Sequence, residues 1–155
     1  SLRLGFVVLP QALAAVAAPL LKESLRGGHR HEQLALAEFI ESGQFSRHLG
    51  RMRRLYRSRQ ALLRDALAQH LAVPHTVLGG DSGMHLTVRL PPAYPDQAIA
   101  EAARAYDMAP APLSRFSLRA QPEDNGLVLG YGNTSAELFA PLVQRLGALA
   151  RELQA

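Results

Sequence analysis

The chain has 155 residues, of which 48% are hydrophobic, and its formal net charge is +4. This length is typical of one ordinary domain or two very small ones, and the apolar fraction is large enough for a hydrophobic core. The absence of cysteine excludes disulfides and thiolate metal sites and agrees with a reducing cytosol. No uninterrupted apolar stretch reaches about 18 residues, so we expect a cytoplasmic protein without a membrane span.

Arginine accounts for 16 of the 17 basic residues. Together with the abundant Ala and Leu, this excess is typical of a GC-rich genome and does not by itself indicate nucleic-acid binding. Because Lys22 is the single lysine, Schiff-base chemistry would have to use Lys22 or a lysine outside this chain.

The first part of the chain is predicted to contain a buried strand and two helices. Residues 2–9 form a compact apolar run that ends at Pro10, which is typical of a buried strand. Helices are expected over residues 11–26 and 31–42, because glycine follows each of them. A buried strand so close to residue 1 leads us to expect further sequence before it in the intact protein.

One long helix is predicted over residues 45–70. On a helical projection its apolar stripe consists of Phe45, Leu49, Met52, Tyr56, Leu63 and Leu67. The opposite side carries Arg47, Arg51, Arg53, Arg54, Arg57 and Arg64. Arg59 is the exception, since it falls within the apolar stripe, and we expect it to pair with a carboxylate or with backbone carbonyls at the domain junction.

This arginine-rich helix has two interpretations. Several arginines close together could contact nucleic-acid phosphates. The alternative is the polar side of an amphipathic helix, which faces water or a partner subunit. We favour the second, because no helix-turn-helix spacing, interleaved aromatic residues or zinc pattern accompanies the arginines.

From residue 73 the sequence changes to short strands and turns. The expected elements are two strands around residues 79–83, a helix over 95–107, an extended proline-rich segment over 108–116, a strand over 126–132 and a helix over 134–154. The last helix opens with the capping-box pattern Thr134-x-x-Glu137. A boundary near residues 70–74 therefore separates a helical part from a small mixed unit.

Histidine and serine residues give weak functional signals. His29-x-His31 could bind a metal only with partners that the sequence does not identify, so we interpret both as surface residues. His85 alternates with apolar residues on a strand and is expected to be half-buried. Ser82 lies in a turn between two predicted strands, whereas a nucleophile elbow joins a strand to a helix. We therefore predict no catalytic residue and no metal site.

Arg3 is the strongest candidate for a binding residue. It lies on the predicted buried strand, where a guanidinium needs an anionic partner. A phosphate is one such partner, because arginine can hold it with two parallel hydrogen bonds. An interdomain salt bridge is the alternative.

Four segments of the chain carry a resemblance to one family. They are "SLRLGFVVLP", "HEQLALAEFIESGQFSRHLGRMRRLYRSRQALL", "GMHLTVRL" and "GLVLGYGN". In this order, and over nearly the whole chain, they resemble the C-terminal half of the aminotransferase-like domain of MocR-type regulators, a branch of the GntR transcription factors. Fold type I aminotransferases share the architecture but match the arginine-rich segment less well.

The resemblance implies an α/β (α+β) fold, the C-terminal part of the pyridoxal-phosphate-dependent transferase fold. Residues 1–43 would complete the large domain, residues 44–71 would form a long interdomain helix, and residues 72–155 would form the small domain. In such proteins an N-terminal winged helix binds DNA. The aminotransferase-like domain, expected to be a homodimer, holds pyridoxal phosphate covalently on a lysine and responds to an amino acid or amine effector.

The resemblance also assigns one site residue in this chain. The family lysine would fall upstream of Ser1, and the family arginine that binds the cofactor phosphate corresponds to Arg3. Aminotransferases use a further arginine near the last small-domain strand to bind the substrate carboxylate, and "DNGLVLGYGN" has none. Arg115 and Arg119 lie upstream of that strand. We expect the fragment itself to have no catalytic activity.

Two other interpretations remain. The chain could be the C-terminal fragment of a class I/II pyridoxal-phosphate-dependent aminotransferase, or a complete small binding protein. A winged helix upstream would indicate a regulator, and its absence would indicate the enzyme. The buried strand at the start argues against a complete small protein.

Overall fold

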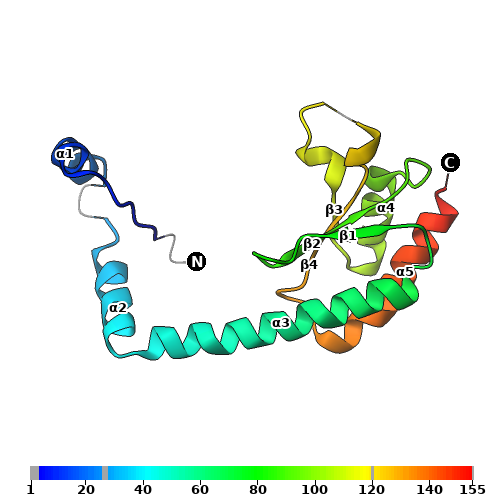
Figure 1. Ribbon diagram of the computed structural model, residues 1–155, viewed down its shortest axis with the longest axis horizontal. Helices are drawn as coiled ribbons and strands as arrows, with labels where there is room; N and C mark the ends of the chain where they lie inside the picture. The colour runs from blue at the N-terminus through cyan, green and yellow to red at the C-terminus, as the bar shows by residue number, and fades with distance from the viewer. Residues whose placement is uncertain (1–3, 26–27, 120, 155) are drawn as a thin grey trace. The chain divides into compact units, whose positions relative to one another are not determined.

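The computed structural model describes residues 4–25, 28–119 and 121–154 (Figure 1). Its α-helices and strands are, in order, α1 (Gln11–Leu25), α2 (Arg30–Glu41), α3 (Gln44–His70), β1 (Thr76–Leu78), β2 (His85–Arg89), α4 (Asp96–Ala103), β3 (Ala111–Pro112), β4 (Gly126–Gly130) and α5 (Phe139–Glu152). The chain divides into two compact units, Ser1–Arg51 and Met52–Ala155. The helix α3 runs across this division.

The first unit contains α1, α2 and the first turns of α3. The described part of the predicted strand at residues 2–9 is not a strand, so that prediction is wrong for residues 4–9. Phe6 and Val8 are 94% and 85% exposed. A strand needs a neighbour to pair its backbone N–H and C=O groups, and the described part of this unit offers none.

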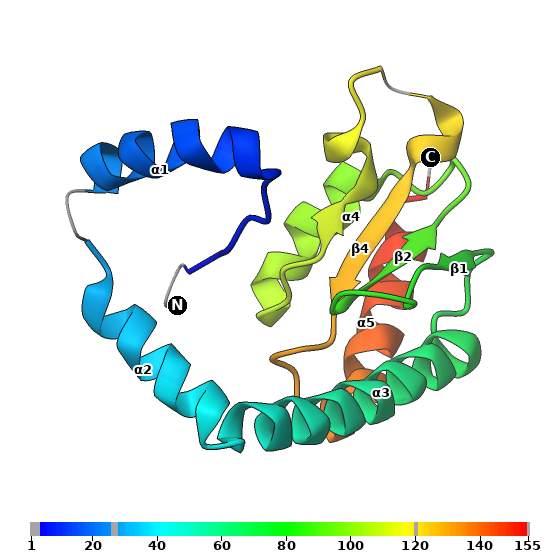
Figure 2. The ribbon, with the colours of Figure 1, turned by 60° about the vertical axis from the view of Figure 1, so that its left-hand side comes forward.

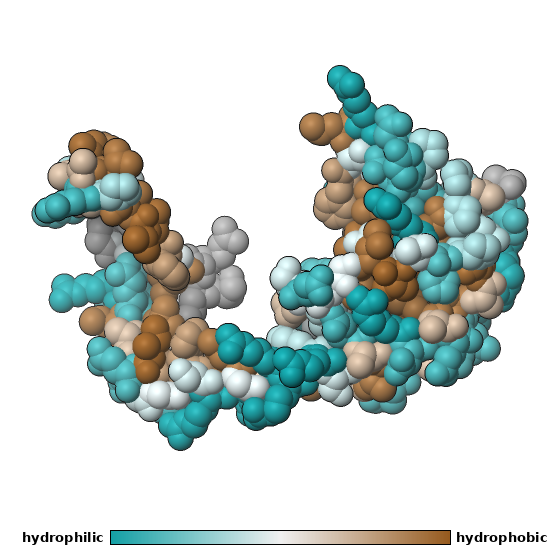
Figure 3. Space-filling view, viewed as in Figure 1, coloured by the Kyte–Doolittle hydropathy of each residue, from teal (hydrophilic) through white to brown (hydrophobic). Residues whose placement is uncertain are grey.

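Apolar side chains remain on the surface of the first unit. Among the large apolar residues of α1, Leu13, Val16, Leu20 and Leu21 are exposed, and Figure 3 shows a continuous apolar (brown) surface there. No described residue of α1 or α2 is buried. Both predicted helices are present, but their described apolar side chains are not buried within their own unit.

The second unit contains a four-stranded antiparallel sheet in the order β1-β2-β4-β3 (Figure 2). Thr87 on β2 pairs with Val128 on β4, which fixes the register of the two central strands. Leu86 and Val88 are fully buried, whereas His85 and Arg89 are exposed. Since strand side chains alternate, one face of the sheet forms the core and the other is open.

The core lies between this sheet and the helices α3, α4 and α5. Its most buried large side chains are Leu67, Leu71, Leu86, Ile99, Leu127 and Val88. Close packing at the end of α3 requires a glycine on α5, because a Cβ on Gly147 would lie 2.0 Å from the carbonyl oxygen of Leu71. The core therefore joins residues that are far apart in the sequence.

The long helix α3 is amphipathic as predicted. Leu63 and Leu67 are buried, and the other members of the predicted stripe, Phe45, Leu49, Met52 and Tyr56, are half-buried. The exposed arginines are Arg47, Arg51, Arg53, Arg54 and Arg57. Arg64, predicted on the same side, is half-buried instead.

Two local predictions in the second unit are wrong. A short 3-10 turn (Ala136–Leu138) precedes α5, and neither element has a side-chain cap hydrogen bond, so Thr134 does not form a capping box. Residues Leu113–Phe116 form a 3-10 turn instead of extended chain. The last proline of that segment is Pro112, so residues after it are free to turn.

Candidate functional site

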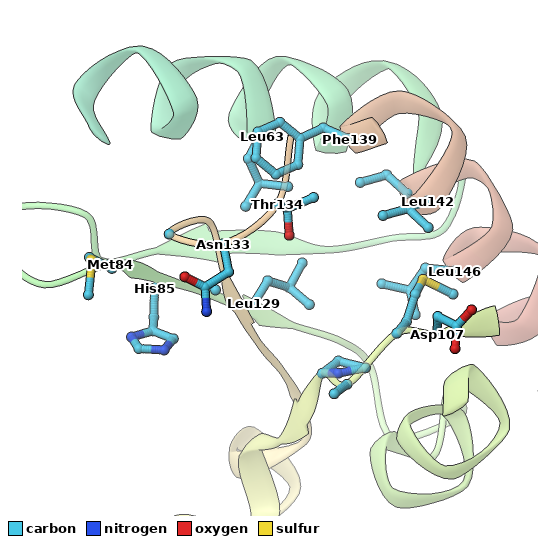
Figure 4. A pocket seen from close by; sticks show the side chains of 16 residues that line it. Leu63, Met84, His85, Asp107, Leu129, Asn133, Thr134, Phe139, Leu142 and Leu146 are labelled. Carbon is cyan, nitrogen blue, oxygen red and sulfur yellow. The ribbon is translucent and has the colours of Figure 1, made fainter. Parts of the chain in front are cut away.

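A pocket of about 410 Å³ lies in the second unit, between the sheet and the helices α3 and α5 (Figure 4). Five separate stretches of the sequence contribute to it, namely Leu63, residues 84–85, residues 107–110, residues 129–134 and residues 139–146. Its volume lies within the range of small-ligand pockets in proteins, about 300–1,000 Å³, towards the lower end. The pocket is therefore of the right size for a small molecule.

Apolar side chains form most of the wall of this pocket. They are Leu63, Met84, Met108, Leu129, Phe139, Leu142, Val143 and Leu146. Polar groups lie at two places: His85, Asn133 and Thr134 come from the ends of β2 and β4, and Asp107 comes from the turn after α4 (Figure 4). Among the described residues, no lysine or arginine lines the pocket.

Three side chains of α3 hold the loops next to this pocket. Arg59 donates a hydrogen bond to the carbonyl oxygen of Gly132, Gln60 donates to that of Gly80, and Arg64 donates to that of Gly79. The prediction that Arg59 pairs with a backbone carbonyl is therefore confirmed. These bonds fix both the β1–β2 turn and the loop after β4 to one helix.

The β1–β2 turn is also held from the sheet side. The hydroxyl of Tyr131 donates to the carbonyl oxygen of Gly83 at 2.9 Å, and the N–H of Tyr131 donates to that of Met84 at 3.0 Å. Tyr131 itself is buried. The turn before His85 is thus held by α3 at Gly79 and Gly80 and by Tyr131 at Gly83 and Met84.

A buried polar cluster supports the opposite end of the sheet. The carboxylate of Asp96 accepts hydrogen bonds from Ser114 N at 2.9 Å, Ser114 Oγ at 3.0 Å and Gly126 N at 3.3 Å. The amide of Asn125 donates to the carbonyl oxygens of Leu90, Pro91 and Tyr94. Sequence reasoning missed both residues, although an Asp at the start of a helix after Pro95 was a signal for Asp96.

The residues singled out from the sequence are scattered. Arg3 lies outside the described residues. Lys22 is exposed on α1, and Arg115 and Arg119 are exposed and do not line the pocket. His85 does line it, but the side chain is exposed, so the expectation of a half-buried histidine is wrong.

The remaining histidine and serine candidates are surface residues. His29 and His31 are exposed, as expected, and Ser82 is exposed in the turn between β1 and β2. Within the described residues, no group of three or more His, Cys, Asp or Glu side chains could hold a metal ion. No helix in the described part of the chain is both long and apolar enough to cross a membrane.

No family model matches this sequence. Two curated bacterial regulators are similar to it. The HTH-type transcriptional regulator YhdI of Bacillus subtilis is 36% identical over 94% of the chain, and the probable rhizopine catabolism regulatory protein MocR of Rhizobium meliloti is 38% identical over 84% of it. The chain spans 31% and 26% of the lengths of these relatives.

The fold is similar to that of solved aminotransferases. LysN, an α-aminoadipate aminotransferase of Thermus thermophilus solved with N-(5'-phosphopyridoxyl)-L-leucine, matches 95% of the chain with a TM-score of 0.73 and 26% identity, and the match covers 37% of LysN. A multiple substrate aminotransferase of Thermococcus profundus matches 75% of the chain with a TM-score of 0.64 and 22% identity, covering 28% of that enzyme. The second similarity concerns the fold alone.

The residues described here do not form a pyridoxal phosphate site by themselves. The pocket contains no lysine that could bind the cofactor covalently and no arginine that could hold its phosphate. The single lysine, Lys22, is on α1 in the other unit. No chemical step through the cofactor therefore follows from the described part of this chain.

Proposed function

Because this chain is a segment of the aminotransferase-like domain of a MocR-type transcriptional regulator of the GntR family, we propose that the intact protein senses an amino acid or amine effector. It would bind operator DNA through a winged helix outside this chain. One combination supports this proposal: the sequence aligns with regulators over most of its length, while the fold is that of an aminotransferase. An effector regulates DNA binding if it binds two conformations of the domain with different affinities.

We also propose how the segment is divided within the intact protein. Residues 1–43 belong to the large domain, residues 44–71 form the interdomain helix, and residues 72–155 form the small domain. The apolar surface of α1, which its own unit does not bury, supports the first assignment, because the rest of a large domain would cover it. The intact protein would act as a homodimer in the cytoplasm.

Pyridoxal phosphate is the cofactor that we propose for the intact protein. When bound, it supplies the covalent chemistry toward amino groups, while the protein provides orientation and selectivity. The role proposed for Arg3 is to hold the cofactor phosphate with two parallel hydrogen bonds. The lysine that binds the cofactor would lie upstream of this chain.

The test uses the intact gene product that contains this segment. We expect it to retain pyridoxal phosphate through dialysis, to change its visible absorbance when L-leucine or another primary amine is added, and to bind a DNA fragment from upstream of its own gene. An intact protein that has no winged helix and converts 2-oxo acids to amino acids would instead be an aminotransferase.

A matched pair of variants tests the role of Arg3. Arg3→Gln should weaken cofactor retention about tenfold or more, because it removes a charge-assisted bond to the phosphate. Arg30→Gln, at an exposed position on α2, should leave retention unchanged. Equal retention by the two variants would show that Arg3 does not bind the phosphate.

A further inference from the structure

The pocket of the second unit has one carboxylate and an apolar wall, and neither is explained by the proposed function. Among the described residues that line it, Asp107 is the single aspartate, glutamate, lysine or arginine. We propose that this pocket binds a small primary amine with a branched aliphatic body, noncovalently and without the cofactor. The inference does not depend on the proposed function, because it concerns residues within the second unit alone.

The apolar wall fits the body of such a ligand. Leu129 rises from the sheet, Leu142 and Leu146 project from α5, and Phe139 closes the end near α3 (Figure 4). Burying aliphatic carbon against these side chains stabilises the complex in proportion to the apolar area that leaves water. A volume of about 410 Å³ limits the ligand to a small molecule.

The position of Asp107 is fixed by the backbone. This residue ends the 3-10 turn after α4 in the left-handed conformation, with φ of 56°, and its N–H donates to the carbonyl oxygen of Arg104 at 3.2 Å. Asp is one of the residues that tolerate this conformation. The turn therefore fixes the backbone of Asp107 beside the pocket.

Two arginines at this turn, Arg104 within it and Arg145 over the ring of Tyr106, have other partners. Arg104 forms an ion pair with Glu101 at 3.0 Å, and the guanidinium of Arg145 lies 4.6 Å from the ring centre of Tyr106. Among the described residues, Asp107 takes part in no ion pair. Its charge is thus available for an ammonium group, and the same charge repels a carboxylate ligand.

The three methionines of the chain provide a direct readout. Met84 and Met108 line the pocket, whereas Met52 does not and serves as an internal reference. With ¹³C-methyl methionine in the 155-residue chain, titration with isopentylamine should shift the signals of Met84 and Met108 to saturation and leave Met52 unchanged. Isopentyl alcohol and isovalerate have the same branched body but a neutral and a negatively charged head group. Comparing their affinities with that of the amine measures the contribution of charge to binding.

The expected order of affinity is amine, then alcohol, then carboxylate. The amine should bind about threefold tighter than the alcohol, which is the size of effect expected for a solvent-exposed ion pair. Asp107→Asn should remove this preference while the alcohol binds as before. Asp81→Asn, in the exposed β1–β2 turn, should preserve the preference.

A blocking variant tests the location independently. Ala109 is exposed at the edge of the pocket, so Ala109→Trp should prevent binding of all three probes without disturbing the core. The proposal is wrong if no saturable shift occurs, if Met52 shifts equally, or if isovalerate binds as tightly as the amine. Shifts of Met84 and Met108 on dilution without any probe would also overturn it, since they would mean that a second copy of the chain fills the pocket.

Discussion

At the scale of single residues, Asp96 determines how three segments of the second unit meet. The residue is 4% exposed, and its carboxylate accepts hydrogen bonds from the 3-10 turn after β3 and from the first residue of β4. Its own N–H donates to the side-chain oxygen of Asn125. A buried carboxylate is costly unless its oxygens are satisfied, and here both oxygens have donors. Asp96 therefore has a structural role, although an isolated acidic residue in the sequence suggests none.

Two replacements of Asp96 show how much of the stability depends on its hydrogen-bond acceptor oxygens. Asp96→Ala leaves three donors without a partner and should lower the free energy of unfolding by about 2–4 kcal/mol. Asp96→Asn keeps one acceptor oxygen and should lower it by about 1 kcal/mol. Urea unfolding followed by circular dichroism measures both, with Asp81→Ala at an exposed position as the control. Equal effects of the Ala and Asn variants would contradict this role.

At the scale of elements, α3 has one side in the core of the second unit and exposed arginines elsewhere. Its second half contributes Leu63 and Leu67 to the core, while its side chains hold the loops at the ends of β1, β2 and β4. Its exposed arginines remain in water. The helix thus supports the pocket in two ways: its apolar side chains pack in the core, and its polar side chains donate hydrogen bonds to backbone carbonyls of the loops.

The bond from Arg59 to Gly132 gives an element-scale prediction. Arg59→Gln shortens the side chain so that it no longer reaches the carbonyl, and stability should fall by about 1–2 kcal/mol. Arg57→Gln, two residues away and exposed, should change stability by less than about 0.5 kcal/mol. Urea unfolding of both variants checks the difference. If the two variants are equally stable, the bond does not hold the loop after β4.

At the scale of the whole molecule, the two units differ in how they bury apolar surface. The nineteen buried hydrophobic residues of the described chain all belong to the second unit. The described helices of the first unit have no buried residue. Because tertiary packing contributes most of the stability of helices in proteins, the second unit should be much the more stable.

Amide hydrogen exchange measured by mass spectrometry tests this difference. Peptides from β2 and β4 should exchange slowly, because their N–H groups pair across the centre of the sheet. Peptides from α1 should exchange orders of magnitude faster, since local opening there exposes no core. Comparable protection of α1 and β4 in a monomeric sample would mean that the first unit is stabilised by packing that this structure lacks.

Local patterns in the sequence predicted the helices well, but they predicted poorly the strand that depends on distant parts of the chain. The apolar stripe of α3 and the exceptional position of Arg59 followed from helical periodicity, because a helix forms its hydrogen bonds within one segment. The strand expected at residues 2–9 did not form in its described part, because a strand depends on neighbours that the sequence pattern does not supply. The capping box predicted at Thr134 does not form, because Thr134 and Glu137 both lie before Phe139, where α5 begins.

The sequence by itself carried the family resemblance, the order of the main elements and the amphipathic character of α3. Only the tertiary structure decided the pocket, the carboxylate of Asp107 at its edge and the buried cluster around Asp96. The pocket draws on five separate stretches of the chain, and no spacing within any one of them predicts it. Periodicity reports which side of an element is apolar, whereas a site depends on which elements meet, and that is set by packing of the core.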